Sequence, residues 1–130
     1  METKIATESQ EQCAFIDYLK VRHPLYYSLI FHVPNGGYRT KWEASSLKKN
    51  GVKSGVPDLF LPVAHPPYHG IFIEMKSKNG RLSDNQLIYC ENVINQNYAV
   101  GICYGFDEAV RCLDDYCLDR FIQEKWLNIK

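Results

Sequence analysis

The chain has 130 residues, in which 15 Lys and Arg balance 15 Asp and Glu to a net charge of zero at pH 7. This length suits one domain with a buried core, and a composition with 45% hydrophobic and 23% charged residues excludes a disordered chain. No segment approaches the roughly 20 apolar residues of a membrane span. The polar N-terminal stretch METKIATESQEQ lacks the apolar segment of a signal peptide. We therefore expect a single domain that spans residues 1–130 and has no membrane partner.

The N-terminal part of the chain predicts one helix and one strand. Residues 7–22 can begin at a Thr7 or Ser9 cap, and their apolar side chains recur at helical spacing. Residues 25–33, LYYSLIFHV, are rich in aromatic and β-branched side chains and predict a strand. The sequence PNGG at 34–37 is typical of a turn.

The middle of the chain predicts a short helix and then two strands. Residues 44–50 lie in a polar, basic stretch and predict a helix that ends at Gly51. Residues 57–63 and 70–76 are apolar, and the proline-rich sequence AHPPYH joins them. Because this connection is short, the two strands are expected to pair as an antiparallel hairpin.

The C-terminal half alternates helix and strand. Residues 82–97 predict a helix, because Ser83 and Gln86 stand at capping-box spacing before a periodic apolar pattern. Residues 98–104 are continuously apolar and predict a central strand buried on both faces. Residues 107–127 predict a helix, in one or two pieces, with an aspartate N-cap. The element order α-β-(loop)-β-β-α-β-α predicts an α/β fold with a mixed β-sheet flanked by helices.

The cysteines and histidines do not form the patterns of a zinc site. Five cysteines, at positions 13, 90, 103, 112 and 117, include no C-x-x-C pair, so buried thiols in a reducing cytosol are the better interpretation. His65 and His69 lie four residues apart in a proline-broken loop, where they share no helical face for a metal.

Basic residues gather in one part of the neutral chain. Between residues 36 and 81 eight basic residues face three acidic ones, so this segment carries +5 and the remainder carries −5. A basic segment suits a polyanionic ligand such as nucleic acid, although a solvated loop face has the same composition.

Two carboxylates and a lysine stand inside the predicted hairpin. Side chains alternate along a strand, so Glu74 and Lys76 project from the same face, and Asp58 begins the neighbouring strand. If the two ends meet, both carboxylates reach one Mg²⁺, which favours one or two carboxylates together with waters and phosphate oxygens. Lys76 can then orient the attacking water or steady the phosphate. The alternative is an ordinary Glu74–Lys76 ion pair, with Asp58 capping a turn after Pro57.

The residues PD at 57–58 and EMK at 74–76 resemble the catalytic signature of the PD-(D/E)xK nucleases. Three longer stretches, VPNGGYR (33–39), LKKNGVKSGVPDLFL (47–61) and IFIEMKSKNGRLSDNQ (71–86), look like the virus-type replication-repair nuclease (VRR-NUC) family in order and spacing. The resemblance extends from the first helix to the strand at Tyr98. It implies a restriction-endonuclease-like core.

By this resemblance, Asp58, Glu74 and the backbone carbonyl of Met75 bind Mg²⁺ or Mn²⁺, and Lys76 is the catalytic lysine. The family's glutamine falls on Gln86, which is also the expected N3 residue of the Ser83 capping box.

The superfamily often adds an acidic residue from the first helix. Here Glu8 is the first choice, because it shares a helical stripe with Phe15 and Leu19, and Glu11 is its rival. A glutamate that interacts with the helix dipole is the plainer interpretation of both.

Residues expected to contact DNA lie in the basic segment. Asn35 and Arg39 match the N-G-G-x-R stretch of the family, and Lys53 and Lys78 flank the catalytic signature. An arginine can bind a phosphate through two hydrogen bonds. A hairpin turn with a surface arginine, and solvated loop lysines, are the alternatives.

The resemblance implies a metal-dependent, structure-selective DNA endonuclease in the cytoplasm of a bacterial or phage-infected cell, with no nucleotide cofactor. Small members of the family are associated with branched DNA, so we expect a Holliday-junction resolvase that acts as a homodimer and leaves a 5′-phosphate. A flap or fork nuclease, and a non-catalytic DNA-binding module of the same fold, are the alternatives.

Overall fold

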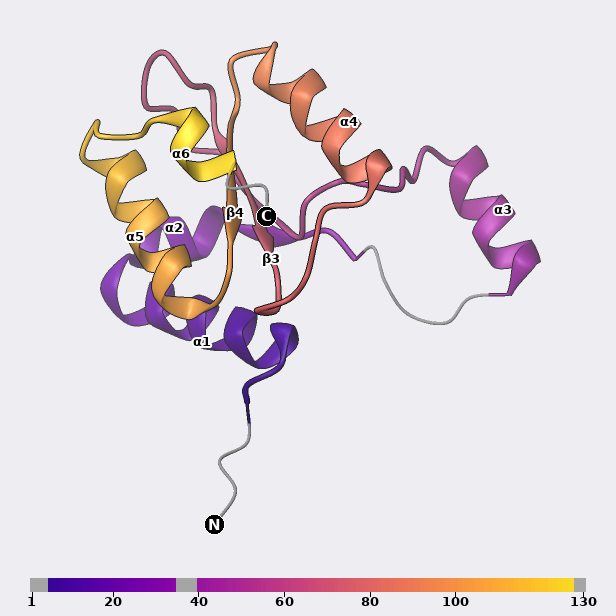
Figure 1. The fold of residues 1–130 in the computed structure, drawn as a ribbon, viewed down its shortest axis with the longest axis horizontal. Helices are drawn as coiled ribbons and strands as arrows, with labels where there is room; N and C mark the ends of the chain where they lie inside the picture. The colour runs from indigo at the N-terminus through magenta and orange to yellow at the C-terminus, as the bar shows by residue number, and fades with distance from the viewer. Residues whose placement is uncertain (1–4, 35–39, 128–130) are drawn as a thin grey trace.

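The computed structural model describes residues 5–34 and 40–127. Within these ranges the strands form one sheet that helices flank, and α3 lies apart from it (Figure 1). The strands are β1 (Phe31–His32), β2 (Leu59–Leu61), β3 (Ile71–Met75) and β4 (Ala99–Cys103). The helices are α1 (Glu8–Arg22), α2 (Pro24–Leu29), α3 (Lys41–Lys49), α4 (Asp84–Ile94), α5 (Phe106–Cys117) and α6 (Gln123–Leu127). Among the described residues, no helix is both long and apolar enough to cross a membrane.

The strands lie in the order β1-β2-β3-β4, and their directions are mixed. β1 pairs with β2 and β2 with β3 in antiparallel fashion, whereas β3 and β4 are parallel. The predicted hairpin is therefore confirmed, with Leu59 opposite Ile73 and Leu61 opposite Ile71. Parallel strands need a crossover connection, and α4 supplies it. The mixed sheet flanked by helices confirms the predicted fold class.

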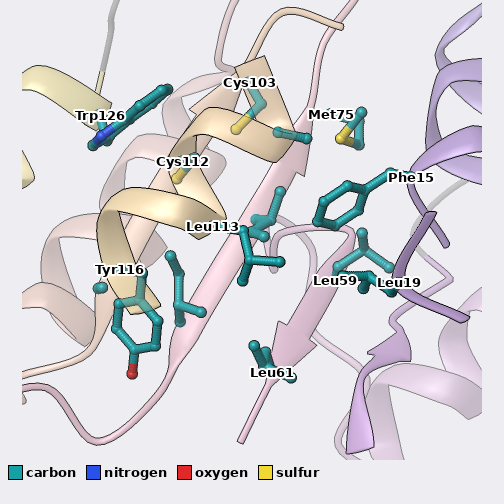
Figure 2. Close-up of a cluster of buried hydrophobic side chains, with 14 residues drawn as sticks. Phe15, Leu19, Leu59, Leu61, Met75, Cys103, Cys112, Leu113, Tyr116 and Trp126 are labelled. Carbon is teal, nitrogen blue, oxygen red and sulfur yellow. The ribbon is translucent and has the colours of Figure 1, made fainter. Parts of the chain in front are cut away.

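Alternation along β3 divides the core into two clusters. Ile71, Ile73 and Met75 are fully buried on one face, where Phe15 and Leu19 of α1 and several side chains of α5 cover them (Figure 2). Phe72 points to the opposite face, in a second cluster with Cys90 of α4 and with Val100 and Ile102 of β4. Covering both faces of the sheet explains why all five residues of β3 are buried.

The predicted strand at 25–33 is wrong over most of its length. Residues 24–29 form α2, and only Phe31 and His32 pair with β2. Pro24 occupies the first turn of α2, where its fixed φ and missing N–H favour a helix start. The ring of Tyr26 stacks on His23, and its hydroxyl bonds His65. These tertiary contacts outweigh the strand propensity of the aromatic residues.

The strand at 98–104 is buried as predicted, but it is not central. β4 ends the strand order of the described sheet, and the side chain of Gln123 in α6 bonds its free edge. The amide nitrogen of Val100 donates to Gln123 Oε1 at 2.8 Å, and Gln123 Nε2 donates to the Val100 carbonyl at 2.7 Å. One glutamine therefore satisfies backbone groups that a further strand would otherwise pair.

The remaining helix predictions differ in their ends. The helices at 7–22 and 82–97 are confirmed, with capping boxes at Thr7 and Ser83. The helix predicted at 44–50 begins earlier, at Lys41, because Thr40 caps it. The C-terminal segment forms two helices, and the N-cap of α5 is Gly105 rather than an aspartate.

Candidate active site

The hairpin brings Asp58 and Glu74 into contact. Because Leu59 pairs with Ile73, Asp58 and Glu74 occupy the next opposing positions at the same end of the two strands. The backbone N–H of Asp58 donates to Glu74 Oε1 at 3.0 Å. In return, the N–H of Met75 donates to Asp58 Oδ2 at 3.0 Å. Each carboxylate therefore accepts a hydrogen bond from the opposite strand, and this fixes both side chains.

Lys76 and Gln86 complete this group of side chains. Lys76 Nζ lies 3.3 Å from Glu74 Oε2 and donates to Gln86 Oε1 at 3.1 Å. Gln86 Nε2 donates to the same Glu74 oxygen at 3.0 Å. Glu74 of β3, Lys76 directly after β3 and Gln86 of α4 thus contact one another pairwise.

Gln86 takes part both in the capping box of α4 and in the contacts around Glu74. Its Oε1 accepts from the N–H of Ser83 at 2.8 Å, while its own N–H donates to Ser83 Oγ, which is the capping box. The same Oε1 accepts from Lys76, and its Nε2 remains available for Glu74. The residue that stabilises the start of α4 therefore also orients the lysine and the glutamate.

A glycine allows the loop before Asp58 to approach α4. Gly55 has a φ of +90°, and a Cβ at this position would lie 2.5 Å from the carbonyl oxygen of Asn85. Ser54 Oγ accepts from the Asn85 side chain beside it. Only glycine combines this backbone conformation with such close contact, so Gly55 fixes the path of the chain into the buried Pro57 and the half-buried Asp58.

Glu74 lies in a site that disfavours its charge. The residue is only 4% exposed. Burial, followed by the neighbouring Asp58 carboxylate, raises the pKa of Glu74 to about 7, although Lys76 acts in the opposite direction. Two carboxylates thus share a poorly hydrated place with one lysine. A divalent cation is the kind of partner that would stabilise both charges.

The donor set fits Mg²⁺ or Mn²⁺ better than zinc. Asp58 and Glu74 supply oxygen ligands, which these hard cations prefer. No group of three or more His, Cys, Asp or Glu side chains suited to a metal occurs in residues 5–34 and 40–127. His65, for example, bonds Tyr26 and lies near Asp119. The metal roles of Asp58 and Glu74 and of the Met75 carbonyl stay predictions.

The two glutamates of α1 lie in different surroundings. Glu8 is exposed and lines an open cavity of about 340 Å³, together with Lys76 and Lys78. Glu11 borders the same cavity, but its Oε2 accepts from the N–H of Phe106 at 2.7 Å. Glu11 therefore caps the start of α5. Glu8 has no such bond among the described contacts, and it stays the predicted metal residue from α1.

The residues predicted to bind DNA do not all lie near this group. Lys78 lines the cavity beside Lys76, whereas Lys53 borders a separate groove under α3. Asn35 and Arg39 lie outside the described residues.

Sequence reasoning missed a contact on the outer side of Asp58. His32 Nδ1 lies 2.9 Å from the Asp58 carbonyl oxygen and 3.1 Å from Gln12 Nε2. The N–H of Val33 donates to the same carbonyl at 2.7 Å. Nδ1 donates to the carbonyl in one ring tautomer and accepts from Gln12 in the other, so a single tautomer makes only one of these two bonds. The Val33 bond holds the end of β1 against the backbone of Asp58 in either case. The available signal was the position of His32, directly before the family-like stretch at 33–39.

The fold of the chain is similar to that of a solved structure. A solved structure named VRR_NUC domain protein aligns with a TM-score of 0.77 and 27% sequence identity, over 88% of this chain and 90% of that chain. The α/β fold of this chain is thus similar to that of a VRR_NUC domain protein.

The family follows from the sequence match. The VRR-NUC domain model matches residues 5–107. The chain therefore belongs to the VRR-NUC family, a family of nucleases. No curated protein matches the sequence.

Proposed function

We propose that the chain is a metal-dependent DNA endonuclease whose active site comprises Asp58, Glu74, Lys76 and Gln86. The contacts among these residues support the proposal. The carboxylates of Asp58 and Glu74 each accept a backbone hydrogen bond across the hairpin, and Glu74 also contacts Lys76 and Gln86. Asp58 and Glu74, with the Met75 carbonyl and Glu8 as further candidates, would hold Mg²⁺ or Mn²⁺. When bound, such a cation lowers the pKa of a water and offsets charge on the phosphate.

Within this site, the chain itself positions a positive charge. Lys76 is largely buried, and Glu74 Oε2 and Gln86 Oε1 direct its ammonium group. A fixed ammonium in a poorly hydrated site stabilises negative charge on a phosphate oxygen more strongly than a solvated one. Lys76 would also orient the attacking water, which requires only a hydrogen bond from Nζ. Lys78 lines the same cavity, which supports a contact between its ammonium group and a neighbouring phosphate.

The proposed substrate is branched DNA, and the proposed assembly is a homodimer. The family resemblance and the basic segment support DNA as the ligand. Two copies related by a two-fold axis would present two sites to a four-way junction, which is nearly symmetric. Exposed apolar side chains on α1, α2 and β1 offer a surface for a second copy, and they include Val21, Leu25 and Phe31.

A nicking assay on matched labelled DNA tests this function. The substrates are a four-way junction, a replication fork, a 5′ flap and a linear duplex, each with Mg²⁺, Mn²⁺ or EDTA. Wild type is compared with Lys76→Ala and with Lys20→Ala, a matched change at an exposed lysine of α1.

Paired cuts in the junction that need metal and are lost only in Lys76→Ala support the resolvase. Cuts in flaps or forks alone retain the nuclease and exclude the resolvase. If no substrate is cut and salt-sensitive binding persists, the chain is a DNA-binding module instead.

A further inference from the structure

Helix α3 stands away from the body of the protein. None of its residues is buried, and it projects beyond the N-terminal end of α4 (Figure 1). Its inner side is apolar: Ala44 and Leu47 are half-buried and, with Val52, border an open groove beneath the helix. On the opposite side Trp42, Ser45 and Lys49 are exposed and Ser46 is half-buried, so this side can meet another molecule.

This outer side combines an aromatic ring with hydroxyl groups and an amine. Trp42 is 78% exposed, and Lys49 is also exposed. The two residues are seven positions apart, about two helical turns, so they lie on one face. Ser45 and Ser46 occupy the turn between them. We define Trp42, Ser45, Ser46 and Lys49 as the α3 face.

The charge around this face is strongly positive. Between residues 41 and 53, four lysines accompany a single glutamate, which gives the segment a charge of +3 in a neutral chain. Protein–protein contact surfaces are usually depleted in lysine at their centre. A solvent-exposed tryptophan surrounded by lysines and serines instead matches a base next to its phosphates, since bases stack on aromatic rings and phosphates pair with cations.

We propose that the α3 face binds unpaired bases of DNA, with Trp42 stacked on a base and Lys49 against a phosphate. The proposal rests on the proposed nuclease function and deepens it. No residue of the α3 face lines the cavity beside Lys76. The face therefore adds affinity for branched DNA that exposes unpaired bases, such as a fork, whereas the residues of the hairpin carry out the cleavage of any branched substrate.

The test measures binding in EDTA, so that it does not depend on cleavage. A fork with single-stranded arms is compared with a fully paired duplex of the same length. The protein has two tryptophans, and Trp126 is 4% exposed. If DNA quenches the tryptophan fluorescence of wild type but not that of Trp42→Phe, the quenching therefore reports stacking on Trp42.

We expect the fork to quench the wild-type emission, whereas the paired duplex quenches it weakly. Trp42→Ala should weaken binding of the fork roughly 5- to 100-fold, which corresponds to one stacked base, and should change duplex binding less than about two-fold. Trp42→Phe should restore most of the fork affinity. Lys49→Ala should weaken binding of both DNAs and lower its dependence on salt.

A similar aromatic–lysine pair provides the control. Lys20 Nζ lies 6.0 Å from the ring centre of Tyr27, which is 40% exposed on α2. At protein concentrations where each variant has the oligomeric mass of wild type, Tyr27→Ala and Lys20→Ala should leave fork binding unchanged.

Three results would overturn the proposal: equal fork affinity of wild type and Trp42→Ala, an equal loss for fork and duplex, or a change in oligomeric mass of Trp42→Ala without DNA. The proposed function fails separately, if wild type cleaves no DNA with Mg²⁺ or Mn²⁺.

Discussion

The hairpin of β2 and β3 and helix α3 belong to the same basic part of the chain, yet they are packed in opposite ways. All five residues of β3 are buried, and the polar groups at its end bond one another. No residue of α3 is buried, and its lysines and Trp42 face solvent. The groups proposed for chemistry are thus fixed by the core before any substrate arrives. The groups proposed to select substrate lie where a change costs the fold little.

The largest expected difference between the two regions concerns stability. Phe15 is fully buried against the sheet face that carries Met75, so Phe15→Ala should lower the free energy of unfolding by about 3–5 kcal/mol. Trp42→Ala removes an even larger side chain from α3, but should change the free energy of unfolding by less than about 0.5 kcal/mol. Urea denaturation of both variants measures this. A loss of several kcal/mol in Trp42→Ala would show that α3 packs on the body.

The next effect concerns catalysis alone. Lys76→Met keeps much of the side-chain volume but removes the ammonium that Glu74 and Gln86 direct. We expect cleavage to fall roughly 100- to 1000-fold, the usual loss when one donor to a developing charge is removed. Single-turnover rates on a labelled fork measure the change, and the matched variant Lys20→Met should keep the wild-type rate. Equal rates for both variants would remove Lys76 from the active site.

A third effect follows from the charge of Glu74 in the metal-free protein. Because its folded pKa, about 7, exceeds the ordinary value of 4.5, ionisation of Glu74 costs stability as the pH rises from about 5 to 7. Glu74→Gln removes this cost. In EDTA, the stability of Glu74→Gln relative to wild type should therefore increase from pH 5 to pH 8, by up to about 3 kcal/mol.

Urea titrations at several pH values test this difference. Added Mn²⁺ should stabilise wild type and leave Glu74→Gln nearly unchanged at pH 8. If the stability difference between Glu74→Gln and wild type stays constant with pH, burial does not raise the pKa of Glu74.

The smallest expected effect concerns the contact between His32 and the backbone carbonyl of Asp58. His32→Ala removes the ring whose Nδ1 lies within hydrogen-bond distance of the Asp58 carbonyl and of Gln12. Groups that support a metal ligand typically alter metal affinity or activity by about 10- to 100-fold, and we expect the lower limit here because Val33 also bonds this carbonyl.

Activity measured against Mn²⁺ concentration should show a raised metal requirement in His32→Ala. His32→Asn, which can still donate to the carbonyl, should restore it. An unchanged metal requirement in His32→Ala would make this contact purely structural.

The sequence predicted those parts of the site whose signals are local. Asp58, Glu74 and Lys76 could be placed together because a short connection forces two apolar strands to pair. The capping box of Ser83 and Gln86 is readable because its residues are three positions apart. Their chemical roles stay predictions, since contacts alone do not establish a reaction.

The features that the sequence did not reveal depend on contacts between distant residues. Glu11 caps α5 from 95 positions away, and Gln123 closes the edge of β4 from 23 positions away. Neither side chain differs in type from an ordinary surface residue. Likewise, residues 25–29 have the composition of a strand, but Pro24 at the first turn and the packing of Tyr26 on His23 and His65 favour a helix.

Cleavage of a labelled DNA fork by wild type and Asp58→Asn, over a range of Mn²⁺ concentrations, tests whether the hairpin is a metal-dependent nuclease site. Asp58→Asn retains the shape of the side chain and an oxygen that can accept from Met75, so both proteins should have similar melting temperatures. We predict saturable cleavage by wild type and none above background by the variant at any Mn²⁺ concentration. Equal cleavage by the two proteins, or cleavage by wild type in EDTA, would contradict the proposed site.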